Sequence, residues 1–169
     1  MGVLLRRRIG KAILVVLLVL CTVGCDQSTK RIAEKRWNDG TTRVLPGGLL
    51  VIRYVENDGA FLGLGAALAK PLRTAVLIVL PAVALAVLGL ALLRGRGLEP
   101  ATLAGWSFLA GGGIGNLIDR VARGGLVRDF LNFGIGNLRT GIMNAADLAI
   151  VAGCLLIVFQ SLRQRRVVP

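Results

Sequence analysis

The stretch at residues 111–147 reads GGGIGNLIDRVARGGLVRDFLNFGIGNLRTGIMNAAD, and we expect the rest of the chain to be organised around it. It carries three aspartates, Asp119, Asp129 and Asp147, beside or between two apolar runs long enough to enter a bilayer. An aspartate at the centre of a membrane helix costs about 2.5–3.5 kcal/mol on insertion scales, so such residues usually serve a function. The simpler interpretation, pairing with an arginine at the interface, fits Asp119 beside Arg120 better than the other two.

The composition indicates a membrane protein. The 169 residues are 54% hydrophobic and 18% charged, with a mean hydropathy of +0.71, which leaves too little polar surface for a soluble globule of this size. A net charge of +12 would suggest nucleic acid as the partner of a soluble chain, but base-reading motifs and stacking aromatic residues are missing. Basic residues flank apolar segments instead, so we expect membrane lipids, and no nucleic acid, as their partners.

The residue types that are scarce or missing exclude several kinds of functional site. Cys21, Cys25 and Cys154 lie in or at the ends of apolar runs, and the chain has no C-x-x-C pair and no histidine. We therefore expect neither a disulfide nor a metal site. The absence of histidine also excludes Ser-His and Cys-His nucleophile pairs, so any hydrolysis would depend on carboxylates or lysine.

Four apolar segments predict a single integral membrane domain over residues 1–169. Spans are expected at residues 9–25, 74–93, 101–118 and 142–162, each near the length that crosses a hydrocarbon core. Residues 26–70 are polar, with turn signals and strand-like runs at 49–52 and 54–55, so we expect a small extracytoplasmic β-element there, with an interfacial helix over 60–69. The predicted fold class is a mainly α membrane protein with four transmembrane helices.

The distribution of charge predicts the orientation. Four spans put both termini on one side, together with the basic turn that contains Arg94 and Arg96. Short segments rich in arginine and lysine favour the cytoplasmic side. Both termini are therefore expected in the cytoplasm, although Lys70 and Arg73 on the other side oppose this assignment.

The first apolar run has a second interpretation. Residues 22–25 resemble a lipoprotein cleavage box, which would make this run a removable signal peptide and Cys25 the mature N-terminus. The motif that begins at Asp26 argues against removal, because it belongs to a larger pattern.

In this topology the unusual polar residues gather in one layer at the outer surface. The pattern Asn-x-x-Asp occurs twice, as Asn116/Asp119 and Asn144/Asp147, and this spacing puts both side chains on one face of a helix. An asparagine there can hold a carboxylate in place, although Asn and Asp are also common helix caps. The expected layer consists of Asp26, Asn57, Asn116, Asp119, Arg120, Asp129, Asn144 and Asp147.

Two carboxylates that share one water can hydrolyse an amide, because charges so close together cannot both ionise. The ionised carboxylate takes a proton from water while its protonated partner polarises the carbonyl, as in aspartic proteases. The residues alone leave two pairs open, Asp119/Asp147 and Asp129/Asp147. Arg120 would keep Asp119 ionised, whereas Asp129 is followed by apolar residues, which favours the second pair.

Five motifs, in order along the chain, resemble those of the bacterial lipoprotein signal peptidases, also called signal peptidase II. The match runs nearly end to end. Residues 26–30 (DQSTK) resemble the family's DQxTK, 57–60 (NDGA) its NxGAAF, 115–120 (GNLIDR) its GNxxDR, 127–130 (VRDF) its VVDF, and 144–147 (NAAD) its FNxAD.

The resemblance implies an aspartyl endopeptidase with four spans, a small β-cradle and an interfacial helix. It would remove the signal peptide from prolipoproteins by cutting before a diacylglyceryl-modified cysteine, near the outer leaflet of the bacterial inner membrane, with no cofactor. It implies Asp129 and Asp147 as the catalytic pair and Asp119 as a structural residue. The residues that would line or support the pocket are Asn57, Asn116, Arg120, Asn144 and Asp26. Prolipoproteins and membrane lipids are the expected partners, and nothing demands more than a monomer.

The chain departs from the family's pattern at Phe61, Arg128 and Met143, where Ala, an apolar residue and Phe are usual. These departures leave room for a specialised or inactive paralogue that binds a precursor or an inhibitor. The alternative from another class is a small transporter in which Asp129 and Asp147 relay ions. A relay does not require all five motifs at once.

Overall fold

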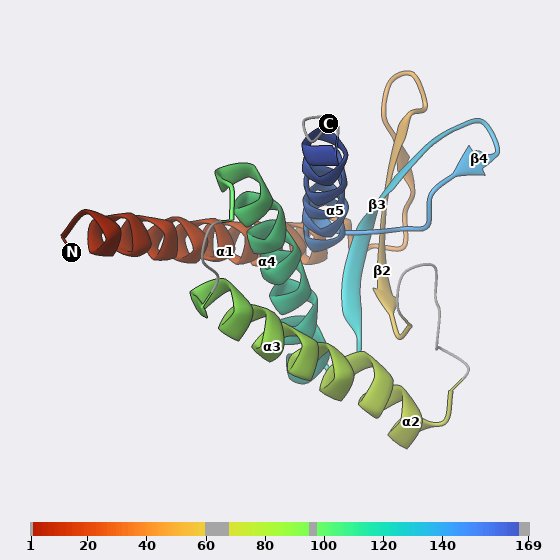
Figure 1. The fold of residues 1–169 in the computed structure, drawn as a ribbon. Coiled ribbons are helices and arrows are strands. Elements are labelled where there is room, and N and C mark those ends of the chain that lie inside the picture. The colour runs from red at the N-terminus through yellow and green to blue at the C-terminus, as the bar shows by residue number, and fades with distance from the viewer. Residues whose placement is uncertain (1, 60–67, 95–97, 166–169) are drawn as a thin grey trace.

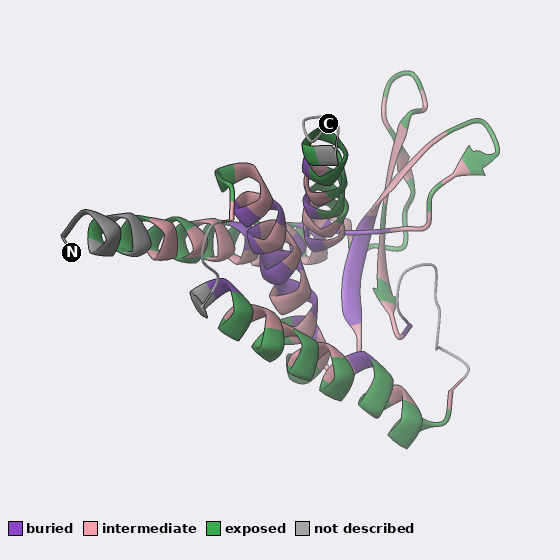
Figure 2. Ribbon diagram, viewed as in Figure 1, coloured by how far each residue is buried: buried purple, intermediate pink, exposed green. Residues whose placement is uncertain are grey.

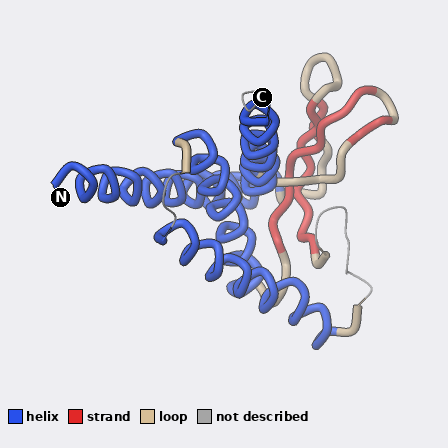
Figure 3. Tube along the Cα trace, in the orientation of Figure 1, coloured by secondary structure: helices blue, strands red, loops and turns tan. Residues whose placement is uncertain are grey.

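The computed structural model describes residues 2–59, 68–94 and 98–165, and most of them are helical (Figures 1 and 3). One continuous helical segment is built from α2, the π-helical turn η2 and α3. The helical elements are α1 (Gly2–Trp37), α2 (Lys70–Thr74), η2 (Ala75–Val79), α3 (Leu80–Arg94), α4 (Pro100–Ala122) and α5 (Ala145–Arg165). The predicted interfacial helix falls mostly on residues 60–67, outside the described residues.

Three of these helical stretches are long and apolar enough to cross a membrane: Ile9–Trp37, Lys70–Leu92 and Ala145–Gln164. The prediction of a mainly helical membrane protein is confirmed. The expected span at 101–118 lies in α4, which is not among the three although its 23 residues would reach about 34 Å. Glycines and the polar residues Asn116, Asp119 and Arg120 lower its hydropathy, so a fourth span stays a prediction.

The first helix is longer than expected. The sequence predicted a span that ends at residue 25 and a polar extramembrane segment after it, but α1 runs to Trp37. No glycine or proline interrupts residues 26–37, and Asp26 and Lys30 pair across one helical turn at 2.8 Å, which supports the helix at this point.

Helix α4 lies between α1, α3 and α5 (Figure 1). Its buried residues include four glycines, Ala110 and Ser107, and Figure 2 shows the buried positions concentrated on α4 and on the first half of the adjoining strand β3 (Val127–Ile135). Small residues let helix backbones approach closely where lipid gives no hydrophobic drive for association. The polar side chains of α4 are therefore enclosed by protein.

A four-stranded antiparallel sheet stands beside the helices, in the order β1 (Arg43–Val44), β2 (Leu50–Asn57), β3 and β4 (Leu138–Arg139). The two predicted strand runs merge into β2, which pairs with β3 and has a bulge between Ile52 and Val55. No strand was predicted between the last two spans. The prediction of a β-element confined to residues 26–70 was therefore incomplete, because half of the sheet comes from after α4.

A glycine turn connects α4 to β3. Gly124 and Gly125 have φ values of +64° and +103°, a left-handed region that other residues rarely adopt. The turn folds the chain back, so that β3 starts beside the C-terminal end of α4 and continues into the sheet (Figure 1).

Hydrogen bonds also join the helices near the start of α4, at the end away from the glycine turn. Lys11 Nζ donates to the Leu98 carbonyl oxygen at 2.7 Å, and Gln160 donates to the Glu99 carboxylate. The early part of α1, the start of α4 and the late part of α5 therefore lie at one end. Which compartment this end faces stays a prediction.

Close packing between α4 and α5 predicts the effect of a single methyl group. At Gly153, a Cβ atom would lie 2.5 Å from the Gly105 carbonyl oxygen and 3.0 Å from the Leu109 nitrogen, whereas at Gly89 on α3 it would meet nothing within 4 Å. We expect Gly153→Ala to lower the free energy of unfolding by about 1–3 kcal/mol and Gly89→Ala to raise it by up to about 1 kcal/mol. Thermal unfolding in detergent measures both, and a Gly153→Ala protein as stable as the Gly89→Ala control would contradict this packing.

Candidate active site

Residues from four elements line one small cavity of ≈ 10 Å³ beside the start of β3. That volume is close to the space for a single water molecule. Asn57 ends β2, Asp129 lies on β3 and Asp147 lies in the first turn of α5. The full lining is Asn57, Asn116, Arg120, Val127, Asp129, Ile142 and Asp147.

Asn144 and Asp147 form a reciprocal cap at the start of α5. The Asp147 backbone N–H donates to Asn144 Oδ1, and the Asn144 backbone N–H donates to Asp147 Oδ2, both at 3.1 Å. This arrangement is a capping box with an aspartate in place of the usual glutamate. The Asn144 amide nitrogen is left to donate to Asn116 Oδ1 at 3.0 Å and to Asp129 Oδ1 at 2.7 Å. The cap and the contact with Asp129 are thus made by one side chain.

Asn116 connects the second carboxylate to a buried lysine. Its Oδ1 accepts from Lys30 Nζ at 2.9 Å, and its Nδ2 donates to Asp147 Oδ1 at 2.8 Å. Asn57 Nδ2 donates to the other oxygen of Asp129 at 2.9 Å. Both Asp129 and Asp147 are therefore oriented by asparagine amides. Asn116 lies well inside α4, so it is not a helix cap.

A buried ion pair helps to hold the residues around the cavity in place. Lys30 and Asp26 are fully buried and lie 2.8 Å apart, and the second oxygen of Asp26 accepts from the Ala146 backbone N–H at 3.0 Å. Asp26 thus joins α1 to the first turn of α5, and Lys30 joins α1 to Asn116 on α4. Lys30 belongs to the first of the five motifs, but no role was predicted for it. The Asp-x-x-x-Lys spacing would have indicated the pair had the helix been extended past residue 25.

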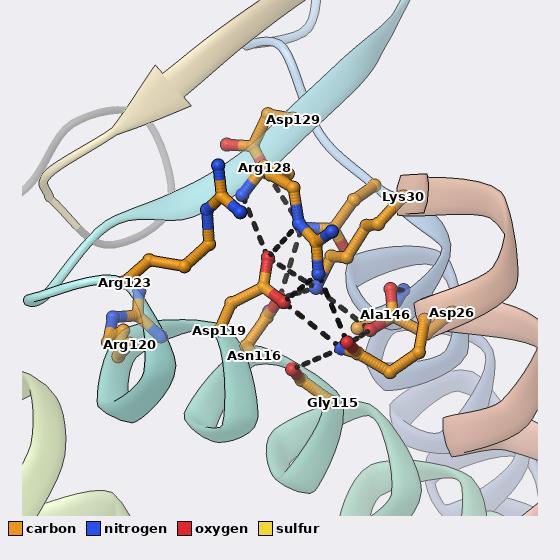
Figure 4. Close-up of polar contacts among 12 residues, drawn as sticks. Asp26, Lys30, Gly115, Asn116, Asp119, Arg120, Arg123, Arg128, Asp129 and Ala146 are labelled. Carbon is orange, nitrogen blue, oxygen red and sulfur yellow. Dashed lines mark hydrogen bonds and ion pairs between the residues drawn. The ribbon is translucent and has the colours of Figure 1, made fainter. Parts of the chain in front are cut away.

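The partner predicted for Asp119 was wrong. Asp119 is fully buried and pairs with Arg128 at 2.7 Å and with Lys30 at 3.6 Å, whereas Arg120 points elsewhere and donates to the Gly59 carbonyl oxygen at 3.0 Å. Successive residues on a helix point about 100° apart, so Asp119 and Arg120 do not face each other. Figure 4 shows Asp119 within the cluster of charges below Arg128.

Two pairs of aspartates were left open by the sequence, and the geometry separates them. Asp129 and Asp147 line the same cavity, while Asp119 does not. Both oxygens of Asp119 are occupied by donors from Arg128 and Gln27. Asp119 is therefore a partner for cations, and the arrangement favours the pair Asp129/Asp147 for chemistry.

Burial raises the pKa of Asp129 to about 6, and the charge of Asp147 acts in the same direction, against the opposing hydrogen bonds from Asn57 and Asn144. Only 2% of the residue is exposed. A carboxyl in such a setting keeps its proton to a higher pH than an exposed one. Asp129 is thus suited to be the protonated member of a pair.

A larger hollow of ≈ 480 Å³ lies on one face of the sheet and includes Val51, Arg53, Asn132 and Arg139 in its lining. Ile142 lines both this hollow and the small cavity. The aspartate pair therefore adjoins a space large enough for part of a polymeric substrate.

The structure shows the surroundings of two of the three departures noted in the sequence. Met143 is buried, and its backbone oxygen accepts from Phe130 and Leu131, so it joins β3 to the start of α5. Arg128 is also buried, among Gln27, Glu34 and Asp119. Phe61 lies outside the described residues.

Sequence comparisons identify one family, and a structural comparison finds a membrane enzyme of similar fold. The family model for signal peptidase (SPase) II matches residues 18–163. A lipoprotein signal peptidase of Chlorobium phaeovibrioides is 37% identical over 153 residues, which cover 84% of this chain and 86% of that protein. One from Bifidobacterium longum subsp. infantis is 39% identical over 140 residues, which cover 79% and 70%. A solved structure described as a bacterial membrane enzyme has a TM-score of 0.77 at 26% identity and covers 89% of this chain and 88% of its own.

The raised pKa of Asp129 predicts how stability depends on pH. Because this pKa is raised from 3.8 to about 6, the folded protein binds more protons than the unfolded chain between these values. The contribution of Asp129 to stability is therefore complete below pH 3.8 and is lost as the pH rises through about 6. Asp129→Asn removes this titration, so the melting temperature of the variant minus that of the wild type should increase from about pH 4 to about pH 7, by the equivalent of up to about 3 kcal/mol.

Thermal unfolding in detergent across this pH range provides the measurement. The substitution also changes the hydrogen bonds that Asn57 and Asn144 donate to residue 129, which can offset the stability of the variant, so the test is the slope of the difference against pH and not its absolute value. A difference that is flat or decreases with pH would contradict a raised pKa at Asp129.

Proposed function

We propose that this chain, which belongs to the signal peptidase II family and removes signal peptides from prolipoproteins, cuts its substrate with Asp129 and Asp147 as a pair of catalytic aspartates. The observation that carries the proposal is that these two carboxylates line one cavity and are each held by an asparagine amide. The proposed chemistry requires no metal or organic cofactor.

The two carboxyls divide the work. Asp129, whose pKa is raised by burial, holds the shared proton and hydrogen-bonds to the scissile carbonyl oxygen, while ionised Asp147 takes a proton from the attacking water. The water oxygen adds to the carbonyl carbon, and the proton of Asp129 moves to the carbonyl oxygen. Asp147 then gives its proton to the leaving nitrogen as the C–N bond breaks, and the proton on the new carboxylic acid returns to Asp129.

Arg120 and the asparagines hold the substrate and the carboxylates. Arg120 lines the cavity, and its Nε is buried without a hydrogen-bond partner among the described residues. A buried donor without a partner is costly, and a backbone carbonyl of the substrate would satisfy it. Asn57 and Asn144 keep the oxygens of Asp129 in place from two sides.

The substrate is a prolipoprotein whose cysteine carries a diacylglyceryl group, and the cut falls immediately before that cysteine. The site lies at the end of the helical body opposite Lys11 and Glu99. With four spans and cytoplasmic termini, this end faces the outer leaflet of the inner membrane, where the lipid chains of the substrate are anchored. The proposed mechanism needs no second chain, because residues of one chain supply both carboxylates and the asparagines that hold them.

Lipid dependence tests the substrate assignment. The purified protein, in detergent, is incubated with a diacylated precursor and with the same precursor lacking the lipid, and the released signal peptide is measured by mass spectrometry. We expect cleavage of the first before its cysteine and little or none of the second. Equal cleavage of both would overturn the requirement for the lipid.

The first mutational prediction concerns the pair itself. Asp129→Asn and Asp147→Asn should each reduce turnover to background while retaining precursor binding, because an amide of the same size neither takes a proton from water nor gives one to the leaving nitrogen. The double variant should be little worse than either single variant, since residues that act as one unit are not additive. A folded Asp129→Asn protein with near wild-type turnover would remove Asp129 from the mechanism.

Asp119→Asn serves as the contrasting variant. It removes the charge that pairs with Arg128 and Lys30 and leaves two buried cations undercompensated, which should lower stability by about 3–5 kcal/mol. Turnover should remain measurable once it is divided by the amount of folded protein. Complete loss of activity in a well-folded Asp119→Asn protein would move the catalytic role to Asp119.

A further inference from the structure

Arg128 stands next to Asp129 in the sequence but points into the helices. Only 6% of Arg128 is exposed, and its guanidinium donates to Asp119 Oδ1 at 2.7 Å and to Oδ2 at 3.1 Å. It also donates to Glu34 Oε2 at 3.0 Å and to Gln27 Oε1 at 3.1 Å. A single side chain of β3 is thus bound to both α1 and α4.

Arg128 and Asp129 lie on opposite faces of β3, as successive residues of a strand do. Figure 4 shows the Arg128 side chain directed from the strand toward Asp119 on α4. The Arg128 backbone N–H also donates to Asp119 Oδ2, at 3.0 Å. The main chain one residue before Asp129 is therefore fixed to α4, as is the side chain.

The other contacts that hold the main chain of this part of β3 are made between backbone groups. Pairing with β2 joins Val55 to Asp129 and Glu56 to Arg128, but β2 belongs to the same sheet. The Met143 backbone fixes Phe130 and Leu131 to the segment before α5. The contact with Asp119 adds an attachment to α4, through a side chain on the face of β3 opposite that of Asp129.

Arg128 also sets the balance of buried charge. Asp26 and Asp119 are both fully buried, and Lys30 lies 2.8 Å from the first and 3.6 Å from the second. Arg128 supplies the second cation, so Lys30 can pair with Asp26 and still donate to Asn116. Without Arg128, two buried carboxylates would compete for Lys30, and the hydrogen bond that orients Asn116 would weaken.

We propose that Arg128 is a positioning residue for catalysis, which anchors β3 to Asp119 and Glu34 and thereby sets the position of Asp129 relative to Asp147. The proposal rests on the proposed catalytic role of this aspartate pair. A displacement of about 1 Å in a catalytic group is enough to reduce turnover roughly 100-fold, so a loose β3 would slow the reaction without removing any reacting group.

The test measures kcat and KM for a diacylated precursor, per amount of folded protein, in Arg128→Met, Arg128→Lys and Arg123→Met proteins. Arg123 is the matched control, because it also pairs with Glu34, at 2.8 Å, but is only partly buried and forms no ion pair with Asp119. We expect kcat to fall about 10- to 100-fold in Arg128→Met with KM within about twofold. Arg128→Lys, which keeps the charge but loses the bidentate fork, should fall in between, and Arg123→Met should match the wild type.

A charge-balanced variant separates positioning from stability. Arg128→Met combined with Asp119→Asn leaves no unpaired buried charge from this pair, so its melting temperature should recover relative to Arg128→Met alone. Its kcat should stay at least about 10-fold below that of the wild type, since the attachment of β3 to Asp119 and Glu34 is still missing.

If the double variant turns over as fast as the wild type, Arg128 serves stability alone and the proposal is overturned. If Arg128→Met or the double variant does not fold, Arg128→Lys decides, and a wild-type kcat there overturns it equally. The wild-type and Asp129→Asn proteins are assayed in the same experiment. An active Asp129→Asn protein would show that the proposed catalytic assignment is wrong, which is a separate failure from that of the Arg128 proposal.

Discussion

The oxygen of the Asn116 side chain faces Lys30, and the arrangement of the site depends on this contact. A lysine ammonium can only donate hydrogen bonds, so Asn116 must present Oδ1 to Lys30 Nζ, 2.9 Å away. Its amide nitrogen is thereby directed to Asp147. The same oxygen accepts from Asn144, whose nitrogen also reaches Asp129. One buried lysine thus determines how two asparagines present donors to two carboxylates.

Lysine can occupy this position because the helices approach closely. A Cβ atom on Gly115 would lie 2.5 Å from Asp26 Oδ2, and one on Gly111 would lie 2.7 Å from Thr22 Cβ. These glycines on α4 let α1 come near enough for Asp26 and Lys30 to sit within the protein. Isolated charges are expensive to bury, and removal of one member of such a set typically costs about 3–5 kcal/mol. The glycines of the stretch at 111–147 therefore allow the close helix packing in which its charged residues are buried with their partners.

Much of this could be predicted from the sequence, and the failures have physical reasons. Three of the four predicted apolar spans and the strand runs that became β2 followed from pattern and spacing, as did the grouping of polar residues from separate segments. Strand β3 did not, because its residues alternate poorly and Arg128 and Asp129 interrupt the apolar run. The end of α1 was also missed, since a change from apolar to polar residues marks a membrane boundary and does not mark the end of a helix.

Pairing between charged residues was the least predictable feature. Adjacency in the sequence suggested that Asp119 pairs with Arg120, but their side chains point in different directions on the helix. The actual partner, Arg128, lies beyond a glycine turn, on a strand. Such contacts depend on tertiary structure. The local cap formed by Asn144 and Asp147, in contrast, follows from spacing alone.

The central claim, that Asp129 and Asp147 act on the peptide bond within the frame set by Lys30 and Asn116, can be tested by a crystal structure of the Asp147→Asn protein with an uncleaved diacylated precursor. We expect the scissile carbonyl to lie between residues 129 and 147, with its oxygen within hydrogen-bonding distance of Asp129, about 2.6–3.2 Å. A precursor bound with this carbonyl beside Asp119, or away from both residues 129 and 147, would contradict the claim.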